Sequence, residues 1–127
     1  MEVGDTFEKK FSYTQEDVDL FAKVTGDYNP IHLDQDYAEK SIFGRRILHG
    51  MLSASIFSKI FGTEWPGNGT IYLKQSLQFL LPMFVEIEYT SVCEIVNVVR
   101  NNIEIKTEIF DENNNITITG IAKVKLP

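Results

Sequence analysis

One stretch of this chain, residues 49–62, has the spacing of a helix but almost no polar side. Its apolar side chains cover nearly the whole circumference of the predicted helix: Met51, Leu52, Ala54, Ile56, Phe57, Ile60 and Phe61. A helix that is apolar all round must be buried on most sides in a globular protein. Gly62 is expected to end it. The rest of the chain therefore has to supply a concave cover.

The second half of the chain supplies strands that suit such a cover. A first strand is expected from residue 70 to Pro82, with one apolar face formed by Ile71, Leu73, Leu77 and Phe79. Three more alternating runs, residues 83–95, 103–109 and 116–126, are separated by short turns rich in Asn and Asp. Long alternating strands joined by short turns predict an antiparallel meander with one buried face. Residues 3–12 would add an edge strand or an extended arm.

Together these elements predict an α+β architecture, with an antiparallel sheet wrapped around a central buried helix. This is the hot-dog fold. A flat two-layer sandwich is the alternative, but it would leave more of the central helix exposed to water.

The chain before the central helix contains further helix signals. Thr14 followed three residues later by Asp17 is typical of a capping box and predicts a helix from residue 15 to Gly26. Asp34 is a suitable N-cap for a second, short helix, which Gly44 is expected to end.

Composition restricts the class of protein. The 127 residues are expected to form a single domain, 1–127, and no apolar run approaches the roughly 18 residues needed for a membrane span. One cysteine, Cys93, allows no internal disulfide and no multi-cysteine zinc site. A net charge of −6 disfavours binding to nucleic acid. The N-terminus lacks the pattern of a secretory signal, so we expect a cytoplasmic protein.

The turn between the first two helices carries the residues best suited to catalysis. Gly26 and Pro30 forbid a continuing helix. Asp27 and His32 place one carboxylate and one imidazole five residues apart across this rigid turn, a pairing suited to acid–base chemistry. Considered alone, the same residues also suit a helix end with turn-forming side chains and an ordinary histidine.

Four segments carry a resemblance to a known family. Residues 21–32 resemble the hydratase motif of the MaoC-like (R)-specific enoyl-CoA hydratases, and residues 47–52, 71–77 and 120–127 also look like that family. The chain looks closest to the short members linked to polyhydroxyalkanoate synthesis. The resemblance implies the hot-dog fold, a homodimer with the two sheets joined edge to edge, and an acyl-CoA substrate with no cofactor and no metal. It implies reversible addition of water to trans-2-enoyl-CoA, giving (R)-3-hydroxyacyl-CoA.

The resemblance also assigns roles to individual residues. Asp27 and His32 would act on the same water, and Asn29 would orient that water or hold the turn; Asn29 could equally satisfy only local backbone. Gly50 would let its backbone N–H stabilise the thioester oxygen, or it would only ease helix entry. Ser58 would reach the active site, although bonding back to its own helix suits it nearly as well.

Other residues are candidates for substrate binding. Met51, Phe79, Leu80 and Met83 are among the candidates for the apolar slot that holds the acyl chain, although most such residues must simply be core. Arg45, Arg46 and Lys74 could bind the phosphates of coenzyme A, although exposed basic residues are usually only solvated. His49 is expected to pack or form hydrogen bonds at the start of the central helix, because no metal-binding spacing accompanies it.

Three competing functions remain. A hot-dog acyl-CoA thioesterase would use the same fold, but that chemistry usually needs a carboxylate on or beside the central helix, and none occurs between His49 and Gly62. A 3-hydroxyacyl-carrier-protein dehydratase would act on the same acyl end. A non-catalytic acyl-thioester binder would not need the polar turn.

Overall fold

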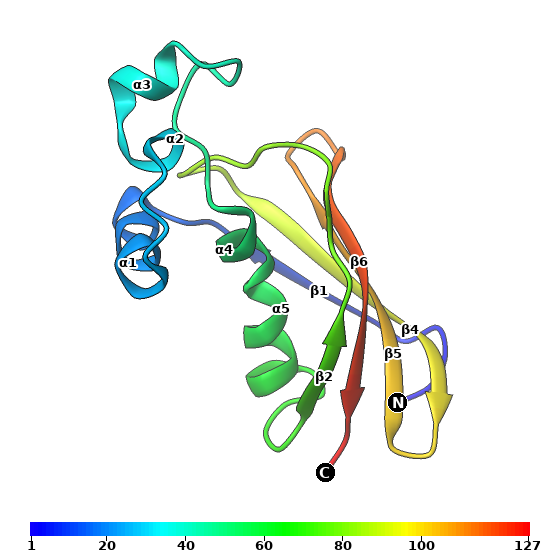
Figure 1. The fold of residues 1–127 in the computed structure, drawn as a ribbon. Coiled ribbons are helices and arrows are strands. Elements are labelled where there is room, and N and C mark those ends of the chain that lie inside the picture. The colour runs from blue at the N-terminus through cyan, green and yellow to red at the C-terminus, as the bar shows by residue number, and fades with distance from the viewer.

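In the computed structural model, which describes residues 1–127, one antiparallel sheet curves around one helical segment (Figure 1). The strand order is β1-β4-β5-β6-β2, and the short strand β3 also pairs with β6. The N-terminal helices lie beyond one end of this sheet (Figure 1). The hot-dog architecture predicted from the sequence is confirmed.

The strands that follow the central helix form most of the sheet. Their bounds are β4 Tyr89–Val99, β5 Asn102–Phe110 and β6 Ile116–Lys125. Every second residue of β5 is buried, and β4 follows the same alternation up to Ile95, as the two-residue period predicts. The strand expected to begin at residue 83 begins only at Tyr89, and residues 80–88 are irregular. This sheet provides the concave face that the central helix packs against.

The predicted long strand at residues 70–82 is two strands, β2 Ile71–Gln75 and β3 Gln78–Phe79. The chain leaves regular pairing at Ser76, whose N–H donates to the Ile121 carbonyl (2.9 Å) and whose Oγ accepts from the Ile121 N–H (2.9 Å). This close approach needs Gly120, since a Cβ there would lie 1.8 Å from the Ser76 carbonyl oxygen. The prediction of one continuous strand was therefore wrong. The apolar side chains of β2 are also exposed.

The central helical segment comprises α4 Gly50–Ala54, α5 Ile56–Lys59 and η1 Ile60–Glu64. Its buried side includes Phe57, Ile60 and Phe61, each almost inaccessible to solvent. The segment does not end at Gly62, because a wider π-helical turn carries it on to Glu64.

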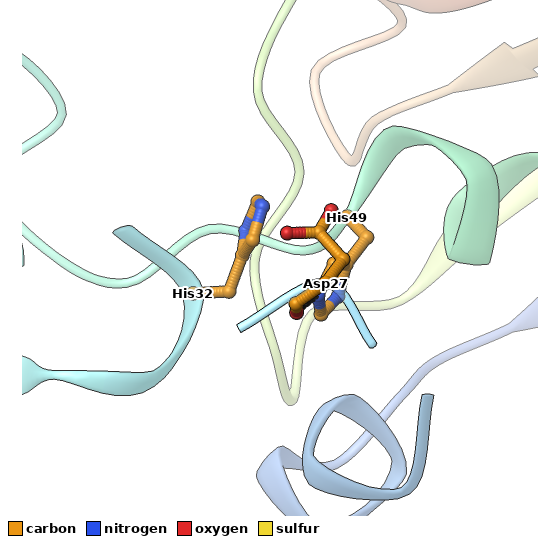
Figure 2. A group of neighbouring side chains, drawn as sticks. All are labelled: Asp27, His32 and His49. Carbon is orange, nitrogen blue, oxygen red and sulfur yellow. Dashed lines mark hydrogen bonds between the residues drawn. The ribbon is translucent and has the colours of Figure 1, made fainter. Parts of the chain in front are cut away.

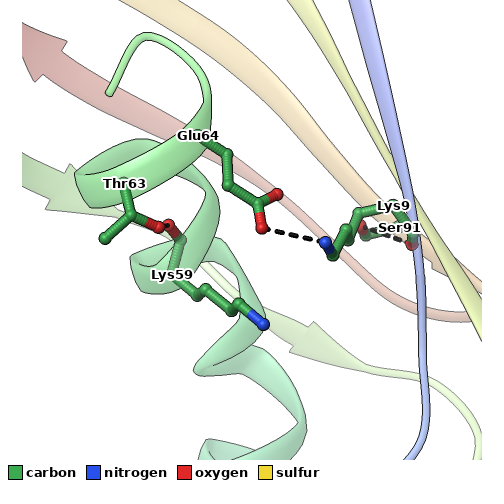
Figure 3. Close-up of polar contacts among 5 residues, drawn as sticks. All are labelled: Lys9, Lys59, Thr63, Glu64 and Ser91. Carbon is green, nitrogen blue, oxygen red and sulfur yellow. Dashed lines mark hydrogen bonds and ion pairs between the residues drawn. The ribbon is translucent and has the colours of Figure 1, made fainter. Parts of the chain in front are cut away.

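The far end of this segment is fixed to the sheet edge. Strand β1, Thr6–Phe11, pairs with β4, and its Lys9 Nζ lies 2.9 Å from the Glu64 carboxylate (Figure 3). Ser91 Oγ donates to the Lys9 carbonyl, which holds the same point from the sheet side (3.1 Å; Figure 3). The predicted edge strand is confirmed, and it anchors the end of the central helix.

The first helix, α1 Gln15–Thr25, has the predicted limits. Thr14 and Asp17 form the reciprocal capping box, and Gly26 ends the helix in the left-handed conformation with φ 80°. These local signals lie within a few residues of one another, and all were correctly interpreted.

Two short helices follow. Helix α2, Pro30–Leu33, was not predicted; a proline suits its first position because its fixed φ matches the helix. Helix α3, Gln35–Glu39, begins at Asp34 as expected, but it ends well before Gly44. The Ser41 hydroxyl donates to the Ala38 carbonyl there (2.6 Å), so the expected end at Gly44 was wrong.

Candidate active site

The turn between α1 and α2 is organised by its own side chains. The Asn29 N–H donates to the Asp27 carboxylate (3.2 Å), and the Asn29 carboxamide oxygen accepts from the Ile31 N–H (3.1 Å), which caps α2. Asn29 therefore holds the turn, the structural role that the sequence left open. Its bond to Asp27 also restrains the carboxylate.

His32 comes from α2 and is only 8% exposed. Its Nδ1 lies 2.8 Å from the Ile47 carbonyl oxygen, which can only accept, so Nδ1 carries the hydrogen. Nε2 is then the nitrogen left with a lone pair. Burial lowers the pKa of His32 below its ordinary value of 6.5, against the opposing effects of the Ile47 carbonyl and Asp27. The ring is thus a neutral base near pH 7.

A second histidine completes the cluster. His49, the residue before α4, is 2% exposed, and its ring stacks on the His32 ring with 3.9 Å between centroids. Ligand-type atoms of Asp27, His32 and His49 all lie within 4.8 Å of one another (Figure 2). The Asp27 carboxylate points toward the His32 ring (Figure 2).

This cluster does not suit a shared metal ion. A metal bound to a histidine lies in the plane of the ring, about 2.0–2.1 Å from the nitrogen. The His32 and His49 rings are stacked, with only 30° between their planes. The planes of two rings stacked in this way meet far from both rings, well beyond the length of a metal–nitrogen bond. The geometry favours acid–base chemistry.

An apolar cavity of about 430 Å³ opens beside His32. Met51, Phe79, Leu80 and Met83 line it, together with residues that the sequence did not indicate. These are Phe43, Ile47, Leu48, Ser53, Leu81, Pro82 and Ile118. A smaller space of about 210 Å³ lies on the Asp27 side and shares His32, Gly50 and Met51 with the first. The space beside Asp27 and the apolar cavity thus adjoin at His32, Gly50 and Met51.

Gly50 lies where these two spaces meet. It is the first residue of α4, so its N–H has no acceptor within the helix and can serve an oxygen in the cavity. A Cβ at Gly50 would lie 2.7 Å from the Phe79 ring, so a larger residue would push that ring aside. The close packing explains why glycine suits this position beyond helix entry alone.

Residues 3–120 match the MaoC like domain family. The chain belongs to this family. It is 40% identical over its whole length to the (R)-specific enoyl-CoA hydratase of Aeromonas caviae, covering 96% of that protein. It is 36% identical over its whole length to the 3-hydroxybutyryl-CoA dehydratase of Methylorubrum extorquens, covering 82% of it.

Solved structures agree. The (R)-hydratase from A. caviae involved in PHA biosynthesis superimposes with a TM-score of 0.96, over 100% of this chain and 98% of that one, at 40% identity. The R-hydratase from Pseudomonas aeruginosa superimposes with a TM-score of 0.94, over 100% of this chain and 83% of that one, at 37% identity. The resemblance to MaoC-like hydratases is therefore confirmed.

In this MaoC-like chain, several predicted residues lie away from the turn. Ser58 and Lys74 line a separate cavity of about 420 Å³, between the central helical segment and β2. Met51 is the one residue that lines both this cavity and the apolar cavity beside His32. Arg45 stacks over the Phe84 ring at 3.6 Å, and Arg46 Nη1 lies 3.5 Å from the Leu33 carbonyl. Neither arginine lines the cavity beside His32.

The sequence missed one feature of this site. The carbonyl that fixes the tautomer of His32 belongs to Ile47. Every residue has a backbone carbonyl, so the sequence could not show which one binds His32. The prediction that His49 packs or forms hydrogen bonds is confirmed, and the structure adds its partners, the His32 ring and the Asp27 carbonyl. The position of His49, one residue before Gly50, was the available signal.

Proposed function

We propose that this protein is an (R)-specific enoyl-CoA hydratase, which adds water reversibly to trans-2-enoyl-CoA and forms (R)-3-hydroxyacyl-CoA. The observation that carries the proposal is that Asp27, His32 and Gly50 line one small space, and that His32 and Gly50 also line the apolar cavity. The relatives named hydratases and dehydratases support it.

The site performs the addition as follows. Asp27 and His32 hold one water, and the free Nε2 of His32 accepts a proton as the water oxygen attacks C3. The electrons of the C2=C3 bond move toward the thioester oxygen, where the Gly50 N–H stabilises the developing charge. C2 then receives a proton from the same pair. Nothing is oxidised or reduced, so the reaction requires no redox cofactor.

The acyl chain and coenzyme A occupy different surroundings. The apolar cavity beside His32 takes the acyl chain, with Met51 at its boundary. We assign the phosphates of coenzyme A to Arg45, Arg46 and Lys74, the basic residues predicted from the sequence. Charge reversal at each of these residues would raise KM for the CoA ester and leave kcat near wild type.

The test of the reaction is direct. Purified protein is mixed with crotonyl-CoA, and loss of the enoyl absorbance is followed. An (R)-specific dehydrogenase, coupled to NADH formation, then reports the stereochemistry of the product. We expect rapid loss of absorbance and an (R) product; an (S) product, or no reaction with any enoyl-CoA chain length, would overturn the proposal.

A carrier-protein substrate is the second candidate. The chain is 32% identical over its whole length to the mitochondrial 3-hydroxyacyl-[acyl-carrier-protein] dehydratase of Arabidopsis thaliana, covering 78% of it. The acyl end of both substrates is the same. Comparing kcat/KM for crotonyl-CoA and for crotonyl carrier protein would separate them.

A thioesterase remains the weaker alternative. Because η1 extends the central segment, that segment does contain one carboxylate, Glu64, which the predicted limits excluded. Glu64 is paired with Lys9 and lines neither space beside His32 (Figure 3). We therefore expect no release of free thiol from acyl-CoA, measured with a thiol-reactive dye.

We also propose that two copies associate through β2. This strand has a free outer edge whose Ile71 and Leu73 side chains are 55% and 48% exposed. The other free edge, β1, carries charged residues that discourage pairing. Light scattering after size exclusion should give twice the chain mass, and Leu73→Lys should shift it to one chain mass. A wild-type monomer at assay concentrations would contradict the dimer.

No helix in the structure combines the length and apolar content needed to cross a lipid bilayer. A cytoplasmic location remains a prediction, and cell fractionation with an antibody against the chain would test it.

A further inference from the structure

His49 forms a specific bond to the catalytic turn. It precedes α4 but makes no side-chain bond to that helix. Its Nε2 instead lies 3.1 Å from the backbone carbonyl oxygen of Asp27, twenty-two residues earlier in the chain. The bond joins the start of the central helix to the residue that carries the catalytic carboxylate.

The His49 ring also packs against two aromatic rings. Its centroid lies 3.9 Å from that of His32, in a stacked arrangement, and 4.8 Å from that of Phe21 on α1. His49 is therefore held between the first helix and the catalytic histidine. Any rotation of its ring would displace both its bond to Asp27 and its contact with His32.

The hydrogen-bond partners show which nitrogen of His49 is the donor. A carbonyl oxygen only accepts, so Nε2 carries the hydrogen. The other nitrogen, Nδ1, is buried and has no hydrogen-bond partner. His49 is thus the donor in its bond to the Asp27 carbonyl.

Resting on the proposed hydratase function, we propose that His49 is a positioning residue for the water-activating pair. Its Nε2–H fixes the Asp27 backbone, and with it the origin of the carboxylate. Its ring fixes the plane of the His32 imidazole and covers one side of it. His49 acts through these two residues and does not touch the reacting atoms.

The two interactions can be separated by substitution. His49→Gln keeps an N–H that can reach the Asp27 carbonyl but removes the ring. His49→Phe keeps a ring but removes the donor. The titratable groups that face His32 are Asp27 and His49, and its burial is the main influence on its pKa. Loss of the ring should therefore make His32 easier to protonate.

The chain has only two histidines, which makes NMR of the imidazole nitrogens decisive. In the wild type we expect the hydrogen on Nε2 of His49 and on Nδ1 of His32. The opposite tautomer of His49 would overturn the proposal without any substitution. In His49→Gln, the single remaining imidazole signal belongs to His32, and its titration midpoint should move to higher pH.

Kinetics provides the second readout. We expect His49→Phe to lower kcat by up to about 100-fold, because misplacing a reacting group by about 1 Å costs that much. Its acid limb of kcat/KM should shift less than that of His49→Gln, because the ring that buries His32 is kept. In His49→Gln, kcat should fall less, and the acid limb should follow the NMR midpoint of His32.

Ile56→Val is the control, since Ile56 is buried on α5 and lines neither space beside His32. If both His49 variants kept the wild-type midpoint of His32 and lost no more activity than this control at equal thermal stability, His49 would be merely structural. If the wild type hydrates no enoyl thioester, the NMR results still decide the positioning role, and only the proposed function fails.

Discussion

The sheet and the N-terminal helical region are specified in different ways. In β4, β5 and β6, buried side chains alternate along paired strands, and the apolar face covers the central helix. In residues 15–49 few side chains are fully buried, and the backbone is held by caps and by side chain–backbone bonds. One region is stabilised by apolar burial and the other by individual polar contacts.

The difference separates stability from chemistry. Apolar burial is not directional, so it can stabilise a fold without placing any one atom. Hydrogen bonds are directional, and those to Asp27, His32 and His49 place the reactive groups. Substitutions in the two regions should therefore separate activity from stability.

The largest effect is expected from removing the acid–base pair. Asp27→Asn and His32→Ala should each lower kcat/KM for crotonyl-CoA by roughly 10²- to 10⁴-fold, the usual contribution of acid–base catalysis. Thermal unfolding should change little for Asp27→Asn, because Asp27 is exposed. Losses within tenfold for both variants would remove these residues from the mechanism.

A core substitution should show the reverse pattern. Ile109→Ala removes a fully buried side chain from β5 and should lower the free energy of unfolding by about 2–5 kcal/mol. Urea denaturation measures this loss. Below the unfolding transition, kcat per folded molecule should stay near wild type; a large fall in kcat would mean that the sheet transmits strain to the site.

The pH dependence links the two properties at His32. Its pKa is lowered by burial, so the neutral base should persist below pH 6.5, and kcat/KM should fall only as the pH drops through this lowered value. The unfolded chain binds this proton more readily. His32 therefore makes stability fall as the pH drops below about 6.5, and this effect levels off below the pKa of the folded protein.

The matched variant His32→Gln isolates this contribution. Between pH 7 and pH 5, the wild type should lose more free energy of unfolding than the variant, measured by urea denaturation at each pH. An equal loss in both would show that the histidine is not destabilised by its surroundings.

A cap substitution should have the smallest effect. Thr14→Ala removes the acceptor for the Asp17 N–H (3.1 Å) and should cost about 1 kcal/mol of folding free energy. Because α1 carries Phe21 against His49, a modest fall in kcat should accompany it. Thr107→Val, within the sheet, is the comparison that should leave kcat unchanged.

The sequence by itself determined the elements whose causes are local. The period of two predicted the paired strands β5 and β6, and the capping box and Gly26 predicted the two ends of α1. The motif also gave Asp27 and His32, whose ligand-type atoms lie within 4.8 Å of each other. Signals of this kind act within a few residues, so they are readable without the fold.

Only the tertiary structure decided how distant residues complete the site. Ile47 lies fifteen residues from His32, and His49 lies twenty-two from Asp27. Ser76 breaks the predicted long strand because Gly120, on a strand formed much later in the chain, allows its carbonyl to approach. These contacts depend on how the elements pack. A residue of any type can offer its backbone carbonyl to an imidazole, so the sequence does not reveal such a contact.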